Sequence, residues 1–347
     1  MNCILEDVIM QKDEPVTAGS KILNGFKSPI TATVVERLLA SGYKIAGRAE
    51  TSEFGISGEN LGAVKTLESG AAEYALCNDI FGNYRKQAPM SNLCYIHPTY
   101  GTVSRYGLVQ TAASMAQIGV LCKNVTDGLT LLSKIAGHDP KDGAMFGEAS
   151  YSYDKPADGI RIGIPAAVTA KADESARYAI NELAGKFQQT SVELDYFDVY
   201  SQVMCILSSA EISNNISRYD GIKYGNRAAE YRGIEDLYVK TRTEAFGIDA
   251  KQAAIMGCLV LSQDYYEKYY DKAMRIRRLI KESSRFDDYD IIALPCNING
   301  DNNALFALAA LAGLPACSFS YNGQGVQLIA NARHEHLFKA VWEGLSI

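Results

Sequence analysis

Histidine and tryptophan are scarce in this sequence, with four and one respectively among 347 residues. The eight cysteines are widely scattered, and no two of them form a Cys-x-x-Cys pair. Zinc sites and disulfide frameworks need closely spaced cysteine and histidine residues, so the sequence predicts reduced, mostly buried thiols and neither a metal nor another cofactor. His334 and His336 do not change this, because residues two apart on a helix face different sides.

Long apolar runs and an excess of positive charge are also absent. No stretch approaches the roughly 20 apolar residues that a membrane span requires, and the first residues lack the basic end of a signal peptide. The net charge of -6 disfavours direct nucleic-acid binding. One basic segment, residues 272–281, is flanked by acidic residues, which favours a solvated, partly paired helix face over an RNA-binding patch. We therefore expect a soluble, cytoplasmic protein without membrane or nucleic-acid partners.

Alternating strand and helix patterns predict an α/β fold in a single domain, residues 1–347. Residues 290–295 are typical of a central strand, and two late strands are predicted to turn at Asn322-Gly323. The loop 143–159 is predicted to be a surface excursion. Helices are predicted over 32–40, from Thr126 onward, over 173–187 and through much of 201–285; further strands are predicted over 44–46, 160–164, 192–197, 316–321 and 326–331.

A series of motifs runs from about Leu5 to the end of the chain. Asp79 and Arg85 flank residue 83, and His97-Pro98-Thr99-Tyr100-Gly101 follows downstream. The other motifs are residues 19–23, 32–38, 47–54, 117–119, 136–142, 218–225, 240–247, 265–270 and 311–316. In this order they closely resemble the amidase signature family, and the later ones resemble in particular the A subunits of glutamine-dependent aspartyl/glutamyl-tRNA amidotransferases. The resemblance implies an amidase-signature fold, a mixed central β-sheet flanked by helices.

The resemblance also implies a mechanism. In the family a lysine acts as base through a serine held by a cis peptide bond, this serine relays a proton from a nucleophilic serine, and backbone N–H groups stabilise the oxyanion. A hydroxyl group becomes a good nucleophile only when a base takes its proton. The position of the lysine falls on Glu6. A carboxylate there adds negative charge beside the oxyanion, and it needs a pKa tuned by burial to serve as a base.

The two catalytic serines of the family are missing as well. Asn83 occupies the nucleophile position, and a carboxamide nitrogen is a weak nucleophile because its lone pair is delocalised. The glycine- and serine-rich run that carries the relay serine is absent between Phe54 and Asn83, which leaves Ser69 as the nearest remnant. Phe81 stands where the oxyanion turn has a glycine. No intact triad is therefore predicted.

Two positions match substrate-binding residues of the family. Arg277 matches the arginine expected to hold the glutamine carboxylate, and Asn303 aligns with the aspartate expected to hold the amine. A structural surface arginine is the favoured interpretation of Arg277. The resemblance further implies that the usual N-terminal helices and one strand of the family are lacking, which predicts an open sheet edge or a docking surface.

Two main hypotheses for function follow. The first is a degenerate relative, a pseudoenzyme that binds the amidotransferase B and C subunits or a small amide or amino-acid ligand. The second is an active glutamine amidase, or a working amidotransferase component, with a rearranged site that uses Glu6 with Ser69 or Ser91. A third hypothesis, a decayed product without function, is disfavoured because the regular pattern of apolar positions predicts a foldable chain.

Overall fold

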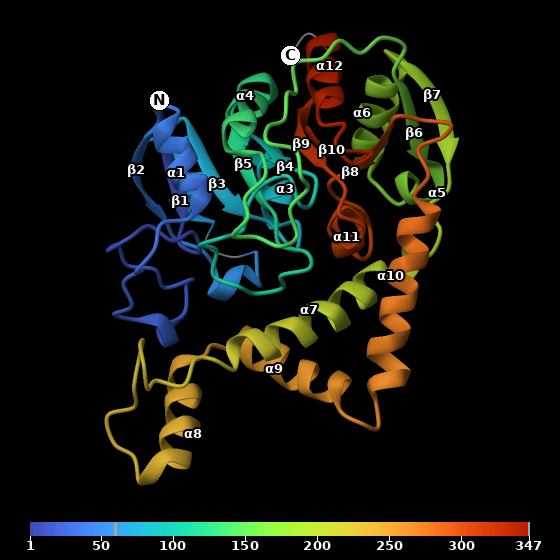
Figure 1. Ribbon diagram of the computed structural model, residues 1–347. Coiled ribbons are helices and arrows are strands. Elements are labelled where there is room, and N and C mark those ends of the chain that lie inside the picture. Colours follow the sequence, from blue (N-terminus) through green and yellow to red (C-terminus); the bar gives the residue numbers. More distant parts are fainter. Residues whose placement is uncertain (59–60, 346–347) are drawn as a thin grey trace.

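A mixed ten-stranded sheet forms the centre of the protein in the computed structural model, which describes residues 1–58 and 61–345 (Figure 1). Its strand order is β2-β1-β3-β5-β4-β9-β10-β8-β6-β7. The strands are β1 (Asn2–Glu6), β2 (Lys44–Ala49), β3 (Tyr74–Asn78), β4 (Cys94–His97), β5 (Ile118–Cys122), β6 (Arg161–Pro165), β7 (Gln188–Val192), β8 (Ile291–Pro295), β9 (Ala316–Tyr321) and β10 (Gln324–Ala330). The helices are α1 (Thr33–Ala40), α2 (Gly62–Glu68), α3 (Asn83–Gln87), α4 (Val125–Ile135), α5 (Ala166–Thr169), α6 (Glu174–Gly185), α7 (Tyr200–Ile216), α8 (Gly233–Ala245), α9 (Ile248–Leu261), α10 (Lys272–Ser283), α11 (Asn302–Ala312) and α12 (His336–Gly344).

Strand direction divides the sheet into three parts. At one end β1 runs parallel to β2 and β3, and at the other end β6 runs parallel to β7 and β8. Between these ends, β5, β4, β9 and β10 form antiparallel pairs. Strands β4, β5 and β8 are buried along their whole length, as expected for strands covered by helices on both faces.

Alternate residues of the first strands enter two separate cores. Leu5 of β1 packs in the larger core with residues of α1 and α4, whereas its neighbour Ile4 packs in the smaller core with residues of α2 and α3. This two-residue period is what a strand covered on both faces requires. Helix α3 therefore lies on the α2 side of the sheet.

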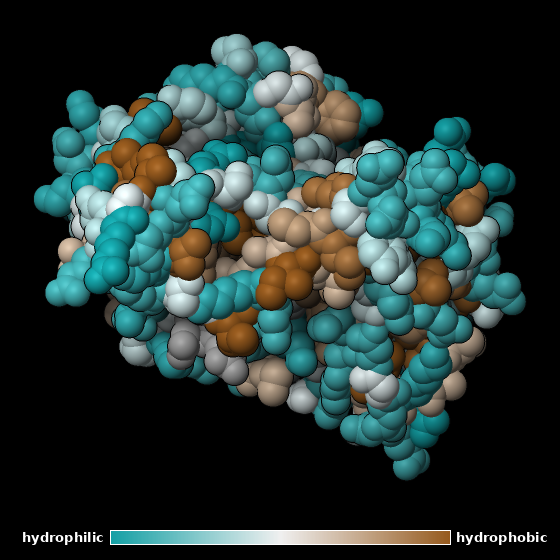
Figure 2. All heavy atoms as spheres, turned by 90° about the horizontal axis from the view of Figure 1, so that it is seen from below, coloured by the Kyte–Doolittle hydropathy of each residue, from teal (hydrophilic) through white to brown (hydrophobic). Residues whose placement is uncertain are grey.

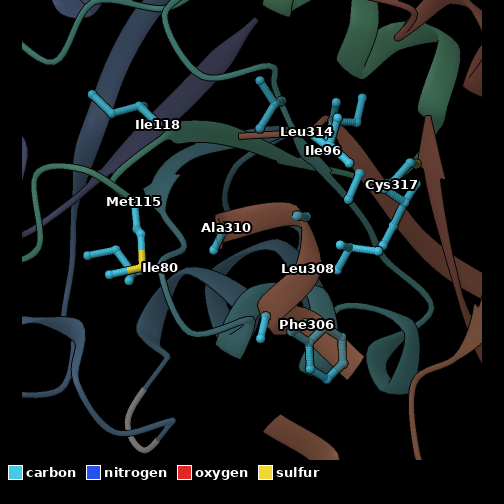
Figure 3. Packing of buried hydrophobic residues seen from close by; sticks show 14 of the residues in the cluster. Ile80, Ile96, Met115, Ile118, Phe306, Leu308, Ala310, Leu314 and Cys317 are labelled. Atoms are coloured by element: carbon cyan, nitrogen blue, oxygen red, sulfur yellow. The ribbon is translucent and has the colours of Figure 1, made fainter. Parts of the chain in front are cut away.

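Helix α11 is the most deeply buried helix of the described part. Residues 304–312 are all buried, because the helix is apolar on every side and packs into the larger core with β4, β5 and β9 (Figure 3). It also contacts α7 and α10.

Helices α7 and α9 pack against each other beneath the sheet, and α8 projects beyond them (Figure 1). Gly257 permits their close approach, since a Cβ atom there would lie 2.1 Å from the carbonyl oxygen of Ser209. This pair of helices faces the N-terminal ends of α3 and α11.

Most of the predicted elements are confirmed. The hairpin of β9 and β10 turns at Asn322 and Gly323, whose φ angles are 50° and 73°, as a type I′ turn requires. The strand predicted over 192–197 is wrong, because β7 ends at Val192 and the chain turns at Tyr196 with φ 63°. Strand β7 forms an edge of the sheet and is largely exposed, so its polar residues carry no alternating pattern.

The basic segment is a partly paired helix face, as predicted. Arg275 pairs with Asp271, Arg278 pairs with Glu282, and Arg277 turns inward. Across residues 1–58 and 61–345, no helix is both long and apolar enough to cross a membrane. Six of the eight cysteines are buried.

Candidate functional site

A tight turn connects β3 to the short helix α3, which begins at Asn83. Gly82 has φ 84° and lies against α11, where an added Cβ atom would meet the Cβ atom of Phe306 at 2.2 Å. Only glycine fits this conformation and this contact without strain. The turn therefore holds residue 83 close to the N-terminal half of α11.

A buried ion pair fixes α3 to the sheet. The Nε atom of Arg85 donates to Oδ2 of Asp79 at 2.9 Å, and both side chains are fully buried. Arg85 also donates from Nη1 to the carbonyl oxygen of Phe306 and to Oε1 of Gln327. The Asp79 carboxylate in turn accepts from the backbone N–H groups of residues 84 and 85. These contacts set the position of residue 83 independently of its side chain.

The side chain of Asn83 holds a loop instead of pointing freely into solvent. Its Nδ2 atom donates to the carbonyl oxygens of Gly55 and Ser57 at 3.2 and 3.1 Å. One helical turn later, Nε2 of Gln87 donates to the carbonyl oxygen of Gly58 at 2.6 Å. Because a carboxamide has two N–H groups, both donors of Asn83 are used by this loop.

Glu6 is buried on the same side of the sheet as α3, with 1% of its surface exposed. It accepts hydrogen bonds from Oγ1 of Thr51 at 2.7 Å and from the backbone N–H of Asn78 at 2.6 Å. Burial raises the pKa of Glu6 to about 7, against the effect of these hydrogen bonds. Glu6 ends β1, and its two partners lie just after β2 and at the end of β3. It is not among the residues that line the cleft beside Asn83.

The structure does not bring the predicted serines to Asn83. Ser69 caps the end of α2, where its exposed Oγ atom donates to the carbonyl oxygen of Thr66. Ser91 lies in a short 3-10 turn after α3. Neither lines the cleft, and the described backbone contains no cis peptide bond.

A cleft of about 700 Å³ opens beside Asn83, between α3, α7, α9 and the start of α11. Seen from the side of α7 and α9, hydrophobic side chains gather near the centre of this face (Figure 2). The lining residues are Ile56, Ser57, Gly58, Phe81, Asn83, Ser201, Met204, Cys205, Ser208, Ser209, Ile212, Asp249, Gln252, Ala253, Ile255, Met256, Leu259 and Asn303. The structure thus brings Asn83 and Asn303 together in one cleft. Phe81, in the turn between β3 and α3, also lines it.

Arg277 stands outside this cleft. Its Nε atom donates to the carbonyl oxygen of Leu311 at 2.8 Å, and its Nη1 and Nη2 atoms donate to Oγ and the carbonyl oxygen of Ser114. Oγ of Ser114 in turn donates to Glu211. The guanidinium group therefore connects α10 to the end of α11 and to the segment before β5. Arg277 is part-buried, and so it is not the surface arginine expected from the sequence.

Most of the cleft was not predicted from the sequence, because its lining comes largely from α7 and α9. One signal was present in the composition. Helix α9 is apolar throughout its second half, residues 253–261, yet Ile255, Met256 and Leu259 there are exposed by 71, 40 and 43%. A helix of that composition is expected to be buried, so its apolar exposed face marks a binding surface.

The histidines near the C-terminal end, His334 and His336, lie close to each other. The rings of His334 and His336 lie 5.6 Å apart, while Glu335 between them is buried and accepts the backbone N–H of Thr99. Among the described residues, no three His, Cys, Asp or Glu side chains are grouped in a way that could hold a metal ion.

Comparison with known proteins agrees with this geometry. The family described as Amidase matches residues 69–337, which is more than half of the chain. This chain belongs to the amidase family. The A subunit of the glutamyl-tRNA(Gln) amidotransferase of Lachnoclostridium phytofermentans is 36% identical, over 84% of this chain and 66% of the relative. Its counterpart from Trichodesmium erythraeum is 34% identical, over 97% of this chain and 82% of the relative. The chain therefore spans less than two thirds of the first of these relatives.

Solved structures show that the fold is that of amidases. The crystal structure of the A subunit of Thermotoga maritima glutamyl-tRNA(Gln) amidotransferase covers 98% of this amidase-family chain, with a TM-score of 0.75 and 24% identity over 81% of its own length. The native peptide amidase of Stenotrophomonas maltophilia covers the whole chain, with a TM-score of 0.79 and 19% identity over 82% of its own length.

Proposed function

We propose that this member of the amidase family is catalytically inactive and binds a ligand or a partner protein. The observation that carries the proposal is the state of residue 83. Both donors of the Asn83 carboxamide are bound to the carbonyl oxygens of Gly55 and Ser57, so the side chain serves as a clamp for the loop. A carboxamide in this state offers neither a nucleophilic atom nor a proton that a base could remove.

The position of the base supports the same proposal. Burial raises the pKa of Glu6 to about 7. The oxygens of its carboxyl group accept hydrogen bonds from Thr51, after β2, and Asn78, at the end of β3. A general base must lie within hydrogen-bond reach of the proton that it removes. Glu6 does not line the cleft, and neither Ser69 nor Ser91 is placed there to relay a proton.

An active amidotransferase A subunit is the second candidate, because named A subunits are 32–36% identical to this chain. Under this hypothesis the chain would release ammonia from glutamine by a rearranged site. The same resemblance leads us to propose the amidotransferase B and C subunits as partners, and the cytoplasm as the place of action.

Ammonia release from glutamine separates the two candidates. The purified protein is assayed alone and with cognate B and C subunits, beside the variants Asn83→Ala and Asn83→Ser. We expect no release above the buffer control in any sample, because serine at position 83 would still lack a relay and a base.

Release that disappears in Asn83→Ala would give asparagine a catalytic part and overturn the proposal. Release that is unchanged in Asn83→Ala would overturn it too, and would direct attention to other groups in the cleft, such as Cys205.

A further inference from the structure

We infer that the cleft beside Asn83 binds an uncharged, largely apolar small molecule and rejects free amino acids. This inference rests on the proposed loss of glutamine chemistry and adds a class of ligand to it. The volume of about 700 Å³ is suitable, since ligand pockets typically measure about 300–1,000 Å³.

The walls of the cleft are mainly apolar. Met204 and Ile212 of α7 form a buried floor, and Ile255, Met256 and Leu259 of α9 form an exposed wall. Phe81 and Ile56 face them from the turn and the loop beside α3. Methionine is unbranched and polarisable, so such walls adapt to alkyl chains and rings of different shapes.

The charges of the cleft disfavour a carboxylate ligand. Over residues 1–58 and 61–345, no lysine, arginine or histidine lines it, and its charged side chain is Asp249. A carboxylate that enters an apolar cleft loses its hydration, and here it would meet a second carboxylate and no counter-ion. Arg277 matches the family residue expected to hold the carboxylate, but it lies outside the cleft and donates hydrogen bonds to Leu311 and Ser114.

Two neutral polar side chains of the lining are exposed to solvent. Gln252 and Asn303 are exposed and carry carboxamides that can both donate and accept hydrogen bonds. The inner hydroxyl of Ser208 already donates to the carbonyl oxygen of Cys205. The geometry therefore favours a ligand with its apolar body inside and one neutral head group, such as an alcohol or an amide, at the rim.

Two cysteines provide a direct test. Cys205 is exposed and lines the cleft, whereas Cys258 is exposed on α9 outside the lining, and the other six cysteines are buried. The wild-type protein is alkylated with iodoacetamide in the presence of hexan-1-ol, hexanamide, hexanoate or glutamine, and mass spectrometry measures the rate at each cysteine.

We expect hexan-1-ol and hexanamide to slow alkylation of Cys205 and to leave Cys258 unchanged. A ligand concentration of about nine times Kd should slow the alkylation of Cys205 about tenfold, because the unprotected fraction is 1/(1 + [L]/Kd). Hexanoate and glutamine should protect neither cysteine. Equal protection by hexanamide and hexanoate, or protection by glutamine alone, would overturn the inference.

A matched pair of variants locates the binding. Leu259→Glu places a charge in the lining, while Leu261→Glu changes a leucine of similar exposure, 38%, at the end of the same helix and outside the lining. Protection of Cys205 should be lost in the first variant and kept in the second. Loss in both variants, or in neither, would contradict the assignment, and circular dichroism checks that both are folded.

The hexanamide samples also separate this inference from the proposed function. Hydrolysis to hexanoate and ammonia would refute the loss of catalysis while the class of ligand stands. An absence of both hydrolysis and protection would refute the class of ligand and leave the loss of catalysis intact.

Discussion

Two residues of the short helix α3 differ in what their side chains do. Arg85, in the middle of the helix, is buried in an ion pair with Asp79, whereas Asn83, at its start, lines the cleft and binds the carbonyl oxygens of a loop. Both residues lie on one short turn of the amidase fold. Arg85 and Asp79 hold the helix in place, whereas residue 83 is the position at which the chemistry would take place. A chain can therefore keep the residues that hold the helix and change the one at position 83.

Substitution of the buried residue Arg85 should have the largest effect on stability. Arg85→Met leaves the buried Asp79 carboxylate without its positively charged partner, and we expect the free energy of unfolding to fall by about 3–5 kcal/mol. Denaturant titration measures the loss. The matched control is Arg278→Met, which removes an exposed pair with Glu282 and should change stability little. Similar effects of the two substitutions would refute the anchoring role of Arg85.

The pH dependence of stability tests the buried carboxyl group on the same side of the sheet. The pKa of Glu6 rises from its usual 4.5 to about 7 in the folded state, so the folded protein keeps a proton that the unfolded chain gives up. Between these values the free energy of unfolding must fall as the pH rises, by an amount on the order of 3 kcal/mol. Glu6→Gln has no group that titrates at this position, so its stability relative to the wild type should rise as the pH increases from 5 to 8.

The difference between Glu6→Gln and the wild type is the quantity to measure, by denaturant titration from pH 5 to pH 8. Other buried groups, such as Glu335 and His97, are the same in both proteins and cancel. Glu36→Gln changes an exposed carboxylate and serves as the control. A difference that stays constant with pH would mean that Glu6 does not titrate in this range.

Substitution of Asn83, at the start of α3, should give the smallest effect. Asn83→Ala removes two hydrogen bonds to the loop, and we expect a loss of about 1–2 kcal/mol in denaturant titration. Asn83→Asp has the same shape without the N–H donors and turns a negative charge toward the carbonyl oxygens of Gly55 and Ser57, so it should be less stable than Asn83→Ala. The opposite order would mean that the helix dipole, which favours an acid at this position, outweighs the clamp.

The sequence predicted those elements that depend only on neighbouring residues in the chain. The turn at Asn322-Gly323 needs only two residues that tolerate positive φ, and α1 and α4 show their apolar stripes directly. Strand β7 could not be predicted from alternation because neither of its faces is well buried, and its place depends on pairing with β6.

The candidate site was predictable only in part. Motif register placed Asn83 and Asn303, which the structure brings to one cleft. The clamp of Asn83 on Gly55 and Ser57 depends on the path of a loop whose residues show no pattern. The apolar wall depends on how α7 packs on α9, and a hydrophobic helix in a sequence does not reveal which of its faces a neighbour will leave uncovered.

The strand order also affects how the protein folds during synthesis. The two halves of the sheet join where β4 pairs with β9, which sets His97 opposite Ala316. The ribosome must therefore produce almost all of the intervening chain before β4 can find its second neighbour. Pairings between such distant residues are slow to form, because the chain must close a long loop before it gains the contact. Until then the edge of β4 can pair with other chains, so we expect folding in the cell to depend on protection of this strand.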